Sequence, residues 1–559
     1  MAAGSPDNQS VYCSFLHFRL RTHGKLQLSA VMLVTAVASI ILVFAAQSDA
    51  RSLVDGNTAR WPSLSFHFSI KRSSTRIHEH SDFSVLANPV VSATGDAVDS
   101  VLYDTFASLT EDSTQYNYTV IDGSAYISHS PLDSDTNAVV DCDDSDVVSS
   151  INSIISALNN ATPVSRISSS SGVIDCPSGN TFRVSVNGID LGLCYSESSG
   201  FKLYGDDMEI AVEFLKTHEQ INKPKFDEKE CAKVALPVLV TSVGKFLLTG
   251  GTIPHDARRL KAMLFNLDLS LKDEPCTCKS TPRPCIFIHG LGIKTEEPEN
   301  LDVFPTKYWG NLTDHAPCCS SMKYAMLDTV NNSWTDGEQQ QKVCDRALAV
   351  NQQPSQDSAI TDTIIITHSM GNLMLAGAIA TGKCSLAASS TWVGLSGPMR
   401  GSMASNYFQD SCKNETNFLV ENLVAKTGYC PAVDGIDSLA YEGDSYSNPE
   451  QDAAYVEAQK AYRSNVKAVM CSNGFSGLRS DRQWWYWMLG TVVSHHSFKN
   501  DGLVEFDSCA GGFPTSDFGN SYEDKFYVTK LNHADTAFRN GDGLLSKAKM
   551  PVKWFECLL

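Results

Sequence analysis

Three residues far apart in the chain, Ser369, Asp501 and His533, have the side-chain types that nucleophilic catalysis needs. A serine hydroxyl is a weak nucleophile until a neighbouring base takes its proton, and histidine is the usual base. The histidine in turn needs a carboxylate that fixes its tautomer and stabilises the imidazolium. The three residues therefore predict a catalytic triad in which Ser369 attacks, His533 takes the proton and Asp501 orients the histidine.

Each member of this triad lies beside a stretch typical of a strand. Ser369 lies in "IIITHSMGN", Asp501 in "SFKNDGLVEF" and His533 in "LNHADTAF". A strand that turns sharply into a helix holds a serine in a sparsely populated backbone conformation, at about 1–3 kcal/mol of strain, and presents its oxygen. Gly371 supplies the small neighbour that such a crossing of strand and helix requires.

A further stretch, "PCIFIHGLG", runs as a buried strand into His289 and Gly290. The backbone N–H of Leu291, just after this pair, and that of Met370, just after Ser369, are the predicted oxyanion hole. One such donor contributes about 2.7–4 kcal/mol in acyl transfer. His289 itself is expected to order the loop rather than to take part in the chemistry.

From about Pro284 to the C-terminus these stretches, with "PMRGS" and "NDGLV", resemble α/β-hydrolases of the lipase/esterase type. The resemblance implies an α/β-hydrolase fold, a mostly parallel sheet flanked by helices. It also implies hydrolysis of an ester or lipid substrate through an acyl-enzyme, with no cofactor and no metal. A cap or lid is expected in the insertion at about 403–466. The sequence departs from the G-x-S-x-G pattern at Thr367, whose branched side chain crowds the turn.

Other residues compete for some of these roles. Asp507 could replace Asp501 if the strand register differs. His495 and His496 precede Asp501 too closely to be the base and are expected to order its loop. Asp535 resembles a calcium ligand, although a hydrogen bond within the loop is the simpler interpretation.

The aromatic run "QWWYWMLG", with Trp484 to Trp487 at its centre, has two interpretations. It is either a surface that faces lipid, as a lid or a membrane-interface anchor, or a buried helix. The net charge of −19 argues against a nucleic-acid partner, because phosphate binding needs clustered lysine and arginine.

The stretch from Leu26 to Ala46 is apolar and uncharged, and is long enough to cross a bilayer. Arg19, Arg21 and Lys25 precede it, so the positive-inside rule predicts a single-pass type II membrane protein. The alternative is a signal peptide cleaved before Arg51, followed by secretion. In either case the remainder is lumenal or extracellular.

Cysteine and sequon usage supports an exported glycoprotein. Of 17 cysteines 16 follow the apolar segment, which fits up to eight disulfides. Cys276, Cys278 and Cys285 lack the paired spacing of a zinc site, and Cys509 is expected to be in a disulfide. Five glycosylation sequons follow the segment, at Asn117, Asn160, Asn311, Asn331 and Asn414.

The chain is too long for one core, so several domains are expected. The predicted divisions are a cytosolic tail (1–25), a transmembrane anchor (26–47), a stem (48–82), a small α+β or β-rich domain whose function the sequence does not indicate (83–225) and the hydrolase domain (226–559).

A second functional hypothesis is a catalytically silent hydrolase-fold ectodomain used for binding or adhesion. The presence of all three triad residues favours the enzyme.

Overall fold

The computed structural model describes residues 61–93, 99–132, 138–143, 146–196, 199–225, 231–251, 267–351, 358–413, 415–416, 429–480 and 483–559. Thr58 to Leu559 form one compact unit. The predicted cytosolic tail and transmembrane anchor lie outside the described residues. Within the described ranges, no helix combines the length and the apolar character that crossing a membrane requires.

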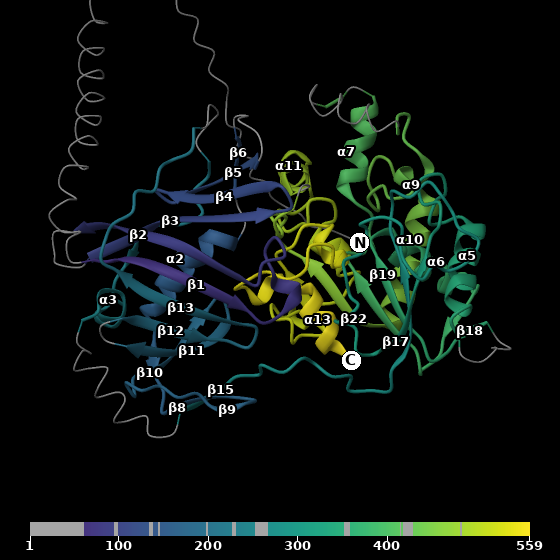
Figure 1. The fold of residues 1–559 in the computed structure, drawn as a ribbon. Coiled ribbons are helices and arrows are strands. Elements are labelled where there is room, and N and C mark those ends of the chain that lie inside the picture. Colours follow the sequence, from purple (N-terminus) through teal and green to yellow (C-terminus); the bar gives the residue numbers. More distant parts are fainter. Residues whose placement is uncertain are drawn as a thin grey trace, which may run out of the picture. The chain divides into compact units, whose positions relative to one another are not determined.

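The largest sheet is antiparallel and has twelve strands (Figure 1). Their order is β6-β5-β4-β3-β2-β1-β13-β12-β11-β10-β7, and β14 pairs with β3. The strands are β1 (Ser63–Ile70), β2 (Asp82–Ala93), β3 (Asp99–Glu111), β4 (Thr114–Ile121), β5 (Ser124–Pro131), β6 (Val139–Cys142), β7 (Thr162–Pro163), β10 (Thr181–Val186), β11 (Ile189–Ser196), β12 (Gly200–Tyr204), β13 (Met208–Leu215) and β14 (Val238–Leu239).

This sheet buries one face through strict alternation. In β1 the side chains of Leu64, Phe66, Phe68 and Ile70 are buried, while the residues between them point away from this core. The helix α2 (Asp146–Leu158) packs against β3, β4 and β10, and contributes isoleucines and a leucine to the same core.

The predicted fold class, a mostly parallel α/β-hydrolase fold with only a small N-terminal domain before it, is wrong for this chain. The largest sheet is antiparallel, and its twelve strands compare with six in the parallel sheet. The sequence predicted a small α+β or β-rich domain at 83–225, but not a sheet of this size, because serine, aspartate and threonine occupy much of the exposed faces of the strands. Ser63–Ile70, which the sequence places in a stem, is the central strand β1.

The second sheet is parallel, with six strands in the order β17-β16-β19-β21-β22-β23. Its two central strands, β19 and β21, are buried along their whole length, because helices and loops cover both faces. The strands are β16 (Arg283–Ile288), β17 (Cys319–Ala325), β19 (Ile364–His368), β21 (Thr391–Leu395), β22 (Val466–Ser472) and β23 (Phe526–Thr529).

Three helices cover one face of the parallel sheet, and α6 contacts both of its neighbours (Figure 1). They are α5 (Gly337–Leu348), α6 (Met370–Ala380) and α10 (Pro449–Asn465). The core on the other face includes α13 (Pro551–Leu558). The other described helices are α3 (Ser242–Thr249), α7 (Met403–Cys412), α9 (Asp434–Asp437), α11 (Gln483–Val492) and α12 (Phe506–Cys509). The smaller sheets consist of β8 (Arg166–Ser169), β9 (Gly172–Val173) and β15 (Asp268–Ser270), and of β18 (Ala359–Ile360) and β20 (Ser385–Leu386).

The cysteines after the apolar segment form eight disulfides, as predicted. Cys509, near the expected acid, is bonded to Cys471. The other pairs are Cys142–Cys231, Cys176–Cys194, Cys276–Cys557, Cys278–Cys318, Cys285–Cys319, Cys344–Cys384 and Cys412–Cys430.

A buried ionic cluster ties the segment after β1 to the C-terminal helix α13. Arg72 forms ion pairs with Glu556 and, at 3.3 Å, with Asp542. His315 donates to Glu556 at 2.7 Å. Burial alone would raise the pKa of Glu556, but the hydrogen bonds from His315 and Arg72 and the charge of Arg72 outweigh it and lower the pKa to about 2.

We expect Glu556→Gln to lower the free energy of unfolding at pH 7 by about 2–4 kcal/mol, because it breaks a buried ion pair. The folded pKa of Glu556, about 2, lies below its ordinary value of 4.5. Its contribution is therefore complete above about pH 4.5 and is lost as the pH falls toward 2. The urea unfolding midpoints of variant and wild type, measured from pH 7 to pH 3, should approach each other as the pH falls. Glu523→Gln, which removes an exposed ion pair with Lys272, is the control and should cost under about 1 kcal/mol.

Candidate active site

Two segments of the predicted site, the loop that begins at His289 and the turn at Ser369, follow neighbouring parallel strands at the point where the strand order reverses. From β16 the chain adds β17 on one side, and then β19, β21, β22 and β23 on the other. Ligands of such sheets bind at this reversal, beyond the carboxyl ends of the strands. His289 directly follows β16, and Ser369 directly follows β19.

Ser369 adopts the backbone conformation that the sharp turn requires. Its φ is 55° and its ψ is −131°, and α6 begins at the next residue. A positive φ is unfavourable for serine and persists only where the surroundings impose it. Here the Ser369 N–H donates to the Leu395 carbonyl at 2.9 Å, at the end of the neighbouring strand β21.

Glycine is required where α6 crosses the end of β16. A Cβ on Gly371 would lie 2.6 Å from the carbonyl oxygen of Ile288, closer than real Cβ contacts allow. The predicted crowding by Thr367 does not occur. Its hydroxyl donates to Asn372 Oδ1 at 2.6 Å and accepts from Trp392 Nε1 at 2.7 Å, so the branched side chain fits between two polar partners.

Asn372 is a functional residue that sequence reasoning missed. Its amide nitrogen donates to the carbonyls of Leu395 at 3.0 Å and Ser369 at 3.1 Å, so it braces both sides of the turn. The signal was present, because Asn372 is the one strongly polar residue of the otherwise apolar "MGNLMLAGAIA" of α6 and is fully buried.

The structure places Asp501 and His533, which the sequence assigns to one site, in direct contact. His533 Nδ1 donates to Asp501 Oδ2 at 2.8 Å, and both side chains are buried. Burial alone would raise the pKa of Asp501. The charge and hydrogen bond of His533, with the N–H groups of Val504 (2.7 Å) and Leu503 (3.0 Å), outweigh it and hold the pKa below its usual range. The proton on Nδ1 leaves Nε2 of His533 able to accept another.

Ser369 is linked to His533 indirectly, through the residue before it. His368 Nε2 donates to the backbone oxygen of His533 at 3.0 Å, and the two rings lie 4.8 Å apart. In the described part of the chain no hydrogen bond joins Ser369 Oγ to His533 Nε2. Such contacts often close only when substrate binds. Ser369 retains 7% exposure.

The rival residues take supporting positions. His495 Nδ1 donates to Glu505 at 2.5 Å, and Glu505 closes the loop that carries Asp501. His495 therefore orders the acid loop, as expected. His496 pairs with Asp444 at 3.3 Å. Among the described residues, no hydrogen bond joins Asp507 to His533, so the geometry favours Asp501 as its partner.

The loop after β16 passes close to Ser369 at Gly290, where an added Cβ would lie 2.8 Å from Ser369 Oγ. Neither Leu291 nor Met370 uses its backbone N–H in a hydrogen bond within the described ranges. His289 Nε2 accepts from Leu327 N at 3.0 Å, so its Nδ1 carries the proton and donates to Gly290 O at 2.7 Å. Burial lowers the pKa of His289 to about 4, so His289 is neutral at pH 7 and orders the loop.

We expect Gly290→Ala to abolish reactivity at Ser369, because the added Cβ must displace either the serine or the loop, and thermal unfolding of the variant shows how much stability this displacement costs. A Cβ at position 290 would lie 2.4 Å from Ser369 Cβ and 2.8 Å from its Oγ. The rate of labelling by a fluorophosphonate, a general probe of activated serines, should fall by at least about 10²-fold. Gly337→Ala is the matched control, since its Cβ would meet only Lys383 Nζ at 4.0 Å. Equal labelling of both variants would contradict the placement of this loop.

Asp535 forms hydrogen bonds within the protein instead of a metal site. It accepts from Leu478 N at 2.6 Å and from Asn540 at 2.5 Å. No group of three or more potential ligands that could hold a metal ion occurs among the described residues. Burial raises the pKa of Asp535 to about 6.

This raised pKa predicts a loss of stability as the pH rises through 6. The folded pKa exceeds the ordinary value of 3.8, so the contribution is fully present below about pH 4 and lost as Asp535 ionises. Relative to Asp535→Asn, wild type should lose up to about 3 kcal/mol between pH 4 and pH 7, measured by urea unfolding. Asp302→Asn, at an exposed position, is the control, and its free energy of unfolding should change with pH in parallel with that of wild type.

The aromatic run forms α11, and the interpretation as a wholly buried helix is wrong. Trp484 and Trp487 are 62% and 47% exposed. The helix also supports the acid loop, because a Cβ on Gly502 would lie 2.8 Å from the carbonyl oxygen of Tyr486. An exposed aromatic surface therefore lies next to the loop that carries Asp501.

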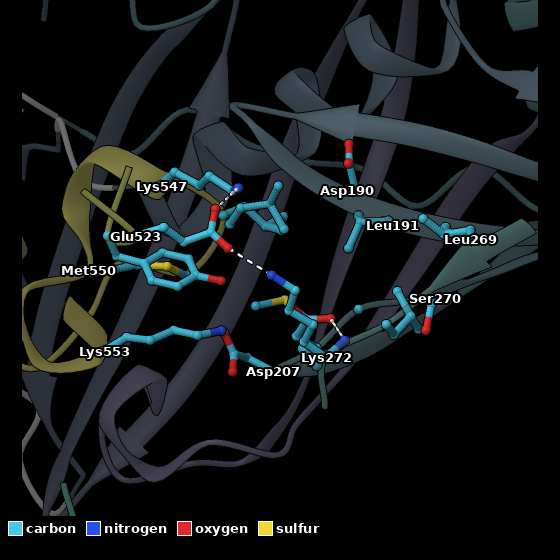
Figure 2. A pocket seen from close by; sticks show the side chains of 17 residues that line it. Asp190, Leu191, Asp207, Leu269, Ser270, Lys272, Glu523, Lys547, Met550 and Lys553 are labelled. Carbon is cyan, nitrogen blue, oxygen red and sulfur yellow. Dashed lines mark hydrogen bonds and ion pairs between the residues drawn. The ribbon is translucent and has the colours of Figure 1, made fainter. Parts of the chain in front are cut away.

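A separate cavity of about 260 Å³ lies away from these residues, and Figure 2 shows the side chains that line it. Lys272 and Lys547 point to Glu523, at 3.0 and 3.4 Å, and Lys553 pairs with Asp207 at 2.5 Å. None of the predicted site residues lines this cavity.

No protein-family model matches the chain, and no curated protein matches it in sequence. The resemblance to lipases and esterases therefore stays a prediction. The functional proposal depends on the geometry of the site alone.

Proposed function

We propose that the protein is a serine hydrolase that cleaves carboxylic esters through a Ser-His-Asp triad and an acyl-enzyme. One observation supports the proposal above all others. His533 and Asp501 form a buried pair, 2.8 Å apart, and the backbone of His533 contacts His368. His368 directly precedes Ser369, whose backbone is strained. Backbone strain of this kind is typical of functional sites.

The proposed reaction assigns one step to each group. Ser369 Oγ attacks the ester carbonyl while its proton passes to His533 Nε2, and Asp501 stabilises the resulting imidazolium. The N–H groups of Leu291 and Met370 bind the oxyanion. The carbon–oxygen bond to the alcohol then breaks, and His533 gives its proton to the leaving alkoxide. Water repeats the sequence on the acyl-enzyme and restores Ser369.

A lipid ester is the favoured substrate. The exposed tryptophans of α11 lie beside the acid loop, and aromatic residues of this kind favour a lipid interface. The apolar segment 26–47 is proposed to anchor the protein in a membrane as a single-pass type II protein. Eight disulfides support a lumenal or extracellular site of action, since such bonds persist in oxidising compartments.

Fluorophosphonate labelling of wild type and Ser369→Ala tests the proposal. Wild type should be labelled at Ser369, and the variant should lose both labelling and at least about 10⁴-fold of its ester hydrolysis, because the nucleophile is gone. Ser405→Ala is the matched control, since Ser405 has the same 7% exposure but donates to Ile436 O. A panel of acyl esters of graded length would define the substrate.

Two outcomes would overturn the proposal. Folded wild-type protein that shows no serine-dependent labelling would favour the binding or adhesion ectodomain. Labelling that persists in Ser369→Ala would place the reactive serine elsewhere in the chain.

A further inference from the structure

A chain of buried and partly buried hydrogen bonds joins the three loops of the candidate site. The Gly290 N–H lies 2.7 Å from Tyr308 Oη, which lies 2.6 Å from His368 Nδ1. On the other side of the ring, His368 Nε2 lies 3.0 Å from the backbone oxygen of His533. Thr536 Oγ1 accompanies this last contact, at 3.1 Å from Nε2 and 2.8 Å from the same oxygen.

The direction of every bond in this chain is determined by chemistry. A backbone N–H can only donate, so Tyr308 Oη accepts from Gly290. A backbone carbonyl can only accept, so His368 carries a proton on Nε2, which points to His533. Burial and the nearby charge of His533 lower the pKa of His368 well below its usual value, so the ring is neutral and its Nδ1 accepts the hydrogen of Tyr308.

Each end of the chain adjoins a group that the proposed reaction uses. Gly290 precedes Leu291, whose N–H is assigned to the oxyanion, and His368 precedes the nucleophile Ser369. The third contact holds the backbone of the base His533 itself. These three segments come from the ends of β16, β19 and β23, and a misplacement of about 1 Å between such groups can cost about 10²-fold in rate.

We propose that Tyr308 and His368 are positioning residues, which fix the oxyanion loop, the nucleophile and the base relative to one another. This inference depends on the proposed ester hydrolysis and adds two residues to it. Tyr308 is not an acid or base of the reaction, because its hydrogen and an oxygen lone pair are already used in the chain. A neutral His368 also avoids repulsion with the imidazolium that forms on His533, whose ring lies 4.8 Å away.

The test compares Tyr308→Phe with Tyr324→Phe. Both tyrosines pack against Phe304, but among the described residues the Tyr324 hydroxyl makes no hydrogen bond, so the two changes are matched in chemistry. With a soluble short-chain ester, Tyr308→Phe should lower kcat and the rate of fluorophosphonate labelling by about 10- to 100-fold, with KM within about threefold of wild type. Tyr324→Phe should behave as wild type. Thermal unfolding of each variant shows whether the fold is intact.

Two substitutions at His368 keep the inference testable if Tyr308→Phe fails to fold. His368→Asn retains an acceptor near the position of Nδ1, and His368→Gln retains a donor near that of Nε2. Each preserves one link, so each should lower kcat while KM changes little. Wild-type kcat in a folded Tyr308→Phe, or in both folded His368 variants, would overturn the positioning role. Failure of wild type to label at Ser369 would instead overturn the proposed function.

Discussion

The close crossing of β19 and α6 over the end of β16 is the constraint on which the candidate site depends. Ser369 has a positive φ because α6 must begin at once, and Gly371 lies too close to the Ile288 carbonyl for any side chain. Strain of about 1–3 kcal/mol at such a residue has to be held by its surroundings. The hydrogen bond to Leu395 and the amide of Asn372 hold it here. The same contacts that fix the turn therefore also fix the direction of the serine side chain.

Burial and the available hydrogen-bond partners determine the protonation states of the ionisable side chains in the candidate site. Asp501 stays ionised in a dry loop because two backbone N–H groups and His533 compensate for the lost water. His289 and His368 lie in equally dry surroundings but lack a carboxylate partner, so burial keeps both neutral. Three nearby histidines thus differ in their surroundings. His289 orders the loop after β16, His368 is proposed to position the site, and His533 is the proposed base. Their roles follow from their partners and not from their position in the sequence.

The sequence indicated one contact of the candidate site, that between Asp501 and His533, although it did not predict the fold. Ser369, Asp501 and His533 each lie in a short local pattern, and contact between the last two is consistent with the predicted pairing. Tyr308 could not be found in this way, because its bond to His368 joins residues 60 positions apart through tertiary packing. For the N-terminal region the sequence predicted an α+β or β-rich domain, but not the extent of its antiparallel sheet. Strands such as β4 (Thr114–Ile121, "TQYNYTVI") carry polar residues on both faces of part of their length, so alternation is weak and the full strand is hard to delimit.

The position of α11 is linked to the loop that carries the acid. The α11 helix presents Trp484 and Trp487 to solvent, but its backbone at Tyr486 rests on Gly502 in the loop that holds Asp501. A movement of α11 away from the sheet would remove this support from the loop in which Leu503 and Val504 donate to Asp501. An enzyme that opened in this way would lose its orienting carboxylate while open. The aromatic surface is therefore better suited to contact lipid with α11 in place than to leave the site as a detached lid.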